Sequence, residues 1–337
     1  MTTVEDTREL VRAGGLLSGD GAVVAMLSGG RDSVCLLDIA VALCGAERVR
    51  ALHVNYGLRA ESGGDEALCR ELCEALGVPL EVVRAAREPN AVGNLHAWAR
   101  DLRYGAANEL ARRLDIASGV AVSAEGAAQG HAHGGARVAA GHTATDQVET
   151  ILYRLAASPG RRALLGMPAS EGRLVRPLLE ITREQTAAYC TQRSLAWRED
   201  QSNDSPSYAR ARVRHGLVGA LDAVHPAAQA NVLRTAELLR EETELLDALV
   251  DAELEGGSSV SIERLAELPP ALARLVAIRL AEDVAGTFVP RAGERVGEIL
   301  ALAHRGGCAE LHIGGLVGAV IEGGELRMVR IPSRTRG

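Results

Sequence analysis

Lysine is absent from this 337-residue chain, and all 37 of its basic residues are arginine. A Walker A loop needs a lysine directly after its second glycine. The chain therefore cannot contain that class of nucleotide-binding loop, although other phosphate-binding loops stay open to it.

Paired cysteines are absent as well. The six cysteines form no C-x-x-C pair and stand at positions 35, 44, 69, 73, 190 and 308. Cys69 and Cys73 are four residues apart, a spacing typical of one buried helix face, so we expect reduced core thiols rather than a metal site. Reduced thiols are typical of a cytoplasmic protein, and we expect that localisation.

Long apolar runs and a strong positive charge are also missing. No apolar run reaches the ~20 residues of a transmembrane helix, and the polar, acidic residues 1–6 argue against a secretory signal. The net charge of −7 does not by itself indicate a nucleic-acid binder. Residues 151–215, however, carry 11 arginines against six acidic residues, which fits either a solvated face or a track for a polyanion.

Residues 21–37 have the pattern of a phosphate-binding turn. Seven mostly apolar residues at 21–27 predict a buried strand, residues 28–30 predict a tight turn, and the apolar run from 34 predicts a helix. Glycines let backbone N–H groups approach an anion, and the helix N-terminus adds free donors and a positive dipole. The alternative is an ordinary glycine turn between a strand and a helix.

Strand and helix patterns alternate over the first two thirds of the chain. We expect strands at 21–27, 49–55, 79–84, 137–142 and 195–198, and helices at 34–44, 65–76, 94–114 and 182–193. This alternation predicts an α/β fold with a five-stranded, parallel, Rossmann-like sheet. We expect a catalytic domain at 1–215 and a smaller, mostly helical domain at 216–337, with short strands near 309–313, 317–322 and 325–330.

A segment of small residues at 117–136 interrupts this alternation and predicts a flexible insertion. Its His131 and His133 are more typical of an exposed loop than of a metal site. The sequence leaves the role of the insertion open.

Polar residues follow the fourth expected strand. His142 precedes Thr143, a predicted helix cap, and Asp146 and Glu149 then lie three residues apart on one helix face. The plain interpretation is that these acids cap the helix and balance its dipole. Capping explains one acid better than it explains the whole set.

Several separated segments together resemble the tRNA(Ile)-lysidine synthetases, a family of PP-loop ATP pyrophosphatases. Residues 28–33 match the SGGxDS loop, and residues 141–150 match GHTxxDQxET at every fixed position. The other similar segments are HVNYGLR at 53–59, ARDLRY at 99–104, GMP at 166–168, RPLL at 176–179 and WREDQSN at 197–203, with Arg210 and Arg214 beyond them. SGGxDS alone is shared with other PP-loop enzymes, whereas the set in this order is specific. The resemblance spans about residues 20–215 and is to the short form, which has one appended domain.

This resemblance implies a ligase that joins free L-lysine to C2 of the wobble cytidine in a tRNA(Ile) with a CAU anticodon. The cytidine is first adenylated by ATP with release of pyrophosphate, and lysine then displaces AMP. The product, lysidine, changes codon specificity from AUG to AUA. ATP and Mg²⁺ are the implied cofactors.

The resemblance also implies residue roles. The expected catalytic residues are Asp32, Arg103, His142, Asp146 and Glu149. Those expected to bind ATP are Ser28, Gly29, Gly30, Arg31, Asp32, Ser33, His53 and Asn55, with Asp32 also holding Mg²⁺. Asp146 and Glu149 are expected to bind the lysine cation, since a cationic substrate needs carboxylates, and Arg103 is expected to balance phosphate charge.

The tRNA contacts are expected from arginines. Those at 210, 212 and 214 recur at every second position, which fits phosphate contacts by planar side chains or a solvated surface. We assign tRNA binding to Arg176, Arg210 and Arg214, within a basic track formed by 151–215 and the tail arginines at 327, 330, 334 and 336.

Some positions depart from the family pattern. Tyr56 replaces a usual histidine, Ala157-Ser158 replace Arg-Gly, and Ala163 replaces a glycine. The loop at 158–166 is therefore expected to differ in flexibility or in its contact with tRNA.

Two other functions are alternatives. A tRNA cytidine thiolase shares the fold but carries C-x-x-C pairs for a cluster. A non-catalytic ATP-binding module would leave Asp146, Glu149 and the block at 197–214 without a role. The sequence leaves the oligomeric state open, a homodimer included, and also the basis for rejecting tRNA(Met).

Overall fold

The computed structural model describes residues 2–57, 62–85, 94–120, 134–158, 160–199, 209–289, 291–304, 308–314 and 316–331. The expectations for Arg59, His131, His133, residues 200–208, Arg334 and Arg336 lie outside these ranges. The chain divides into two compact units, Met1–Glu237 and Leu238–Gly337. A catalytic domain that ends at residue 215 stays a prediction. Over the described ranges, no helix is both long and apolar enough to span a bilayer.

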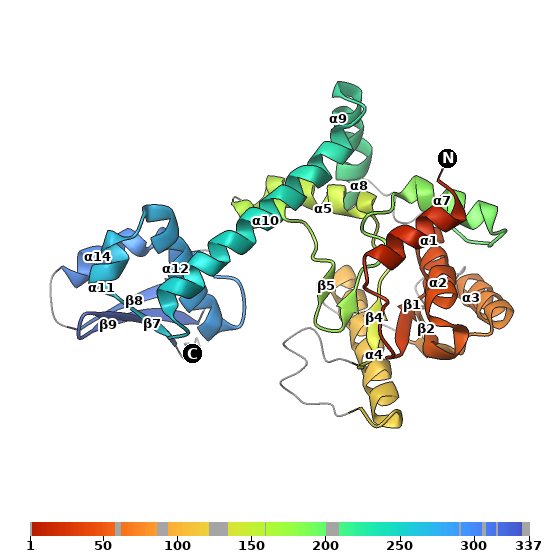
Figure 1. Ribbon diagram of the computed structural model, residues 1–337, viewed down its shortest axis with the longest axis horizontal. Coiled ribbons are helices and arrows are strands. Elements are labelled where there is room, and N and C mark those ends of the chain that lie inside the picture. Colours follow the sequence, from red (N-terminus) through yellow and green to blue (C-terminus); the bar gives the residue numbers. More distant parts are fainter. Residues whose placement is uncertain are drawn as a thin grey trace. The chain divides into compact units, whose positions relative to one another are not determined.

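The first unit is built on a six-stranded sheet with the order β3-β2-β1-β4-β6-β5 (Figure 1). Its strands are β1 Val23–Met26, β2 Val49–Asn55, β3 Leu80–Arg84, β4 Arg137–Ala139, β5 Ser170–Glu171 and β6 Leu174–Val175. All neighbouring pairs are parallel except β5 and β6. The predicted α/β fold with five parallel strands is therefore confirmed, with one short antiparallel strand added at the edge.

The position predicted for the fifth strand is wrong. The fifth parallel strand is β6, and residues 195–198 form no strand. The backbone N–H of Arg198 instead donates to the carbonyl oxygen of Gly29 at 3.0 Å. This hydrogen bond places the segment against the turn after β1, and its apolar pattern alone did not distinguish it from a strand.

Helices cover both faces of the sheet (Figure 1). One core contains Val23 and Ala25 of β1 together with residues of α1 Val4–Ala13, α2 Arg31–Cys44, α3 Ser62–Leu76 and α7 Arg183–Gln192. The other core contains Val24 and Met26 with residues of α4 Leu95–Ala117. Alternate side chains point to opposite faces, so β1 is apolar throughout because both faces are buried.

The rest of the first unit packs around one helix, α5 Ala144–Ala157. Val148 and Leu152 of α5 form a small core with Val213 and Val218. The other elements here are α6 Arg161–Leu164, α8 Ala209–Arg212, the π-helix η3 Val213–Val218, α9 Gly219–Val224 and the start of α10 Ala228–Leu254, while the short helix η1 Ala46–Arg48 lies between α2 and β2. This core places the segment with Arg210 and Arg214 beside α5.

The second unit pairs helices with an antiparallel sheet of order β7-β10-β9-β8. Its elements are β7 Ser259–Ser261, α11 Ile262–Glu267, α12 Pro270–Ala285, α13 Arg291–Glu294, α14 Val296–Ala303, β8 Ala309–Gly314, β9 Val317–Glu322 and β10 Glu325–Arg330. The three expected short strands are confirmed as β8, β9 and β10. Strand β7 is an addition to them.

A buried ionic network joins α1 and α7 to α2. Asp38 of α2 is 2 % exposed. It accepts hydrogen bonds from Arg8 Nη2 at 3.0 Å, the Tyr189 hydroxyl at 2.5 Å and Arg193 Nη2 at 3.0 Å. Burial would raise the pKa of Asp38, but the hydrogen bonds from Arg193, Tyr189 and Arg8 outweigh it and hold that pKa below its usual value.

We expect Asp38→Asn to lower the free energy of unfolding by about 3 kcal/mol, because two arginines lose their charged acceptor. A lowered folded-state pKa gives stability that is present above the unfolded pKa, about pH 4, and is lost as the pH falls through the folded value. Urea unfolding between pH 7 and pH 3 should therefore lose more stability with acid in the wild type than in Asp38→Asn.

Tyr189→Phe is the matched control, because it removes the two hydrogen bonds of the phenol, one to Asp38 and one from Arg8, and keeps the carboxylate. It should cost about 1 kcal/mol. Equal acid dependence in the wild type and in Asp38→Asn would contradict a stabilising role for the ionised Asp38.

Candidate active site

The turn between β1 and α2 has the geometry of an anion cradle. Gly29 has φ +86°, a conformation that favours glycine, and Gly30 precedes α2 without a side-chain cap on the helix. The Ser33 hydroxyl accepts from the Ser28 N–H at 3.1 Å and donates to the Gly30 carbonyl at 2.8 Å. The turn therefore holds its own shape, and the first N–H groups of α2 point toward an anion position.

The end of β4 lies directly against the start of α2. A Cβ atom on Gly141 would lie 3.1 Å from the backbone carbon of Asp32 and 3.2 Å from the backbone nitrogen of Ser33. This contact occurs where the strand order reverses between β1 and β4, which is where parallel α/β sheets bind ligands. It brings the loop after β4 to the cradle.

Three predicted acids meet around one cation at this edge. Arg183 lies with Nε 3.6 Å from Asp32 Oδ2, Nη2 3.3 Å from Asp146 Oδ1 and Nη1 3.6 Å from Glu149 Oε1. The structure thus brings Asp32, from the cradle, together with the two acids of α5.

Sequence reasoning missed Arg183 and its neighbour Thr186. The Thr186 hydroxyl donates to Asp32 Oδ1, and Arg183 is the first residue of α7. A cation is unfavourable at a helix N-terminus, because the dipole is positive there. An arginine directly after the helix cap Thr182 was the signal that could have revealed this residue.

The environment drives the pKa values of two neighbouring acids apart. Burial raises the pKa of Asp32, and repulsion from Asp146 adds to this against the opposing effects of Thr186 and Arg183. Burial would also raise the pKa of Asp146, but the backbone hydrogen bond from Thr143, at 2.9 Å, and nearby arginines lower it. Asp146 is thus the more strongly ionised of the two.

Glu149 is fully buried and faces arginines. Arg214 donates from Nε to Oε1 at 2.6 Å and from Nη2 to Oε2 at 3.2 Å, while Arg210 Nε lies 3.9 Å from Oε2. Arg210 also donates to the Thr150 hydroxyl at 3.2 Å. Two arginines predicted to contact tRNA therefore pair with a predicted lysine-binding acid, and both roles stay predictions.

His142 and Arg103 each have a buried nitrogen atom that makes no hydrogen bond within the described residues. Burial lowers the pKa of His142 to about 4, so the ring is neutral at pH 7, and Arg176, Arg210 and Arg103 act in the same direction against Asp146. Within the part of the chain that is described, neither His142 Nδ1 nor Arg103 Nε has a hydrogen-bond partner, although both are buried. Buried polar atoms normally find partners, so both can serve a ligand.

The two residues predicted to lie near adenine make internal contacts. His53 is 4 % exposed, and its Nδ1 lies 2.9 Å from the carbonyl oxygen of Leu27. Asn55 donates to Glu66 Oε2 at 3.0 Å and accepts from the Gly57 N–H. These contacts shape the loops behind the cradle, and adenine contact stays a prediction.

Two of the predicted arginines also make internal contacts. Arg176 is 3 % exposed and donates to the Pro168 carbonyl at 2.6 Å and to Glu171 at 3.3 Å. Arg31 pairs with the exposed Glu199 at 3.2 Å. Contact of Arg176 with RNA would require its loop to move, so that role stays a prediction.

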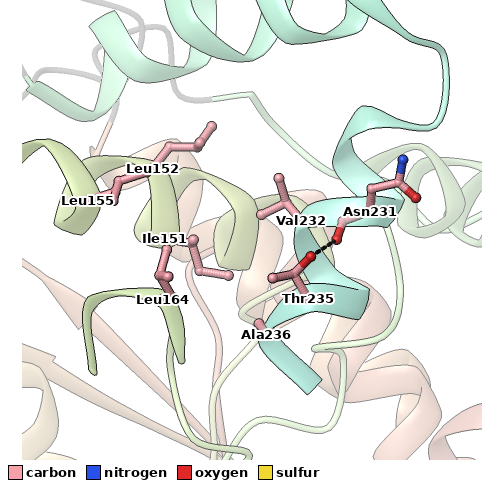
Figure 2. Close-up of a pocket in the computed structure, with 8 residues that line it drawn as sticks. All are labelled: Ile151, Leu152, Leu155, Leu164, Asn231, Val232, Thr235 and Ala236. Atoms are coloured by element: carbon pink, nitrogen blue, oxygen red, sulfur yellow. Dashed lines mark hydrogen bonds between the residues drawn. The ribbon is translucent and has the colours of Figure 1, made fainter. Parts of the chain in front are cut away.

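A separate apolar groove of about 210 Å³ lies between α5, α6 and the start of α10 (Figure 2). Its lining residues are Ile151, Leu152, Leu155, Leu164, Asn231, Val232, Thr235 and Ala236. The Thr235 hydroxyl donates to the Asn231 carbonyl within α10. None of these lining residues is titratable, so the groove is not the site of the chemistry.

Comparison with known proteins agrees with the motif set. A family model described as a PP-loop domain matches residues 4–123 and 128–221. A tRNA(Ile)-lysidine synthase of Salinispora tropica is 35 % identical over 299 residues, which cover 85 % of this chain and 84 % of that protein. The chain belongs to the tRNA(Ile)-lysidine synthase family.

The length of the match differs among members of this family. The tRNA(Ile)-lysidine synthase of Pseudomonas fluorescens is 35 % identical over 249 residues, which cover 72 % of this chain but 51 % of that protein. The chain thus spans about half the length of this relative. Among solved structures, a U34-tRNA thiolase from Methanococcus maripaludis matches with a TM-score of 0.53 at 17 % identity, over 70 % of this chain and 78 % of that one, and shows the shared fold.

We expect Gly141→Ala to weaken ATP binding by about tenfold or more, because the new methyl group would displace the backbone of Asp32 and Ser33 at the cradle. Binding of a fluorescent ATP analogue measures the effect. Gly105→Ala, in α4, is the control, since no atom lies within 4 Å of the added methyl group. Equal ATP affinity in the two variants would contradict the assignment of the ATP phosphates to this turn.

Proposed function

We propose that this lysidine synthase family member uses ATP to join free L-lysine to C2 of the wobble cytidine of tRNA(Ile) with a CAU anticodon. One observation carries the proposal: the anion cradle and the acids Asp146 and Glu149 share one site, with Arg183 between Asp32 and both acids. The cytoplasm is the proposed compartment.

The cradle suits the first step, in which the cytidine oxygen attacks the α-phosphorus and pyrophosphate leaves. Backbone N–H groups at the start of α2 would hold the departing phosphates, and Arg103 would balance their charge. Asp32 suits Mg²⁺, which prefers carboxylate and phosphate oxygens, because its side chain is 20 % exposed at the cradle. Mg²⁺ held there would neutralise charge on the phosphates.

The acids suit the second step, in which the lysine ε-amine attacks C2 and AMP leaves. Asp146 and Glu149 would bind the lysine cation, and a site with little water favours the neutral, nucleophilic form of the attacking amine. His142, neutral at pH 7, would orient the base or ATP through its open Nδ1.

The cysteines argue against sulfur transfer. Cys69 and Cys73 are buried free thiols whose pKa values burial raises to about 12 and about 11. Protonated thiols are poor nucleophiles and poor cluster ligands. This chain therefore shares the fold of the U34-tRNA thiolase but lacks the reactive thiols expected for its chemistry at these two positions.

The decisive experiment combines the purified chain with ATP, Mg²⁺, labelled lysine and a tRNA(Ile) transcript, and scores label in the RNA. We expect incorporation that Asp146→Asn or Glu149→Gln lowers at least about tenfold, through loss of a charge-assisted contact to the lysine cation. Glu184→Gln, an exposed acid on α7, is the control. Pyrophosphate release without label in RNA would contradict the proposal.

We also expect Arg210→Gln with Arg214→Gln to weaken tRNA binding and to reduce the salt slope by about one to two, since each phosphate contact releases about one counterion. Filter binding between 50 and 200 mM salt, concentrations at which phosphate contacts are resolved, measures the slope. Arg113→Gln, an exposed α4 arginine paired with Glu81, is the control. A salt slope equal to that of the wild type would contradict the assignment of Arg210 and Arg214 to the tRNA contact.

A further inference from the structure

One guanidinium group is shared among three carboxylates of the site. Each nitrogen of Arg183 faces a different acid, at 3.6 Å for Asp32, 3.3 Å for Asp146 and 3.6 Å for Glu149. The Arg183 side chain is 16 % exposed, so water screens these interactions less than at the surface.

This sharing differs from the contact between Arg214 and Glu149. Arg214 donates hydrogen bonds to both carboxylate oxygens of Glu149, at 2.6 Å and 3.2 Å, and so occupies one acceptor position on each oxygen. Of the three acids, only Asp146 lies within hydrogen-bond distance of the Arg183 guanidinium, at 3.3 Å. The positive charge of Arg183 therefore offsets the charges of all three acids, and carboxylate lone pairs remain to accept hydrogen bonds from a second cation.

The base of Arg183 is held rigidly. Its backbone N–H donates to the Thr145 hydroxyl at 3.2 Å, and the Ala144 N–H donates to the Ile181 carbonyl at 2.8 Å. The far end of α7 is fixed to α2 through Arg193 and Asp38. The position of the guanidinium is thus set by backbone contacts as well as by the acids.

We propose that Arg183 is a positioning residue that orients Asp146 and Glu149 to receive the ammonium group of the amino-acid substrate, and that links them to Asp32. This inference rests on the proposed function for the identity of that substrate. Arg183 acts through the acids and need not touch lysine.

Removing the charge of Arg183 has a clear physical consequence. Asp146 is 8 % exposed and Glu149 is fully buried. Buried carboxylates that lose a shared cation repel each other and turn apart. That movement removes an aligned pair of acceptors from the lysine site, whereas the Thr186 hydroxyl still holds Asp32 for the ATP step.

The test compares Arg183→Gln, Arg183→Lys and Arg193→Gln in the full chain. For Arg183→Gln we expect the KM for lysine to rise about tenfold or more, with a smaller change in tRNA-dependent pyrophosphate release measured without lysine. Arg183→Lys keeps the charge but has a single nitrogen, so its KM should lie between those of the wild type and Arg183→Gln.

Arg193→Gln controls for a structural role, because it weakens the anchoring of α7 at the opposite end of the helix from Arg183 and the acids. It should lower the melting temperature and leave the KM for lysine unchanged. If Arg183→Gln does not fold, the KM of Arg183→Lys against that of Arg193→Gln decides the question.

An unchanged or lower KM for lysine in a folded Arg183 variant would overturn the inference, since a lower KM would make Arg183 a competitor of lysine. Failure of the wild type to add lysine to tRNA would instead overturn the proposed function. The two failures are therefore distinguishable.

Discussion

The close approach of β4 to the first turn of α2 is the contact on which the site depends. Gly141 has no side chain where the backbone of Asp32 and Ser33 passes. This approach brings His142, in the loop after β4, and Asp146 and Glu149, at the start of α5, to a cradle that lies more than 100 residues earlier in the chain. Neighbouring parallel strands supply the framework, because their carboxyl ends lie at one edge of the sheet.

Charge balance is the second constraint on the site. Asp32, Asp146 and Glu149 would repel one another in a partly buried space, and arginines offset that repulsion. The chain has no lysine, so each of these cations is a planar guanidinium with several donors. Such a group can face several carboxylates at once, and the site can stay ionised while acceptor oxygens remain for a substrate.

Extended segments and arginine spacing were the least reliable sequence signals. Residues 195–198 and β6 have similar local patterns, yet only β6 finds a parallel partner on the open side of β4. The spacing of Arg210 and Arg214 fitted a solvated surface or phosphate contacts; Arg210 is exposed, whereas Arg214 is partly buried and pairs with Glu149 at 2.6 Å. In each case a partner more than 30 residues away in the chain decides the conformation.

The sequence alone determined the α/β alternation, the cradle after β1 and the acids at the start of α5, because these depend on local periodicity, glycine conformation and helix capping. The tertiary structure alone decided that Arg183 and Thr186 of α7 contact Asp32. Their side chains reach the site because α7 packs along α2, and no local pattern encodes which helix lies against another.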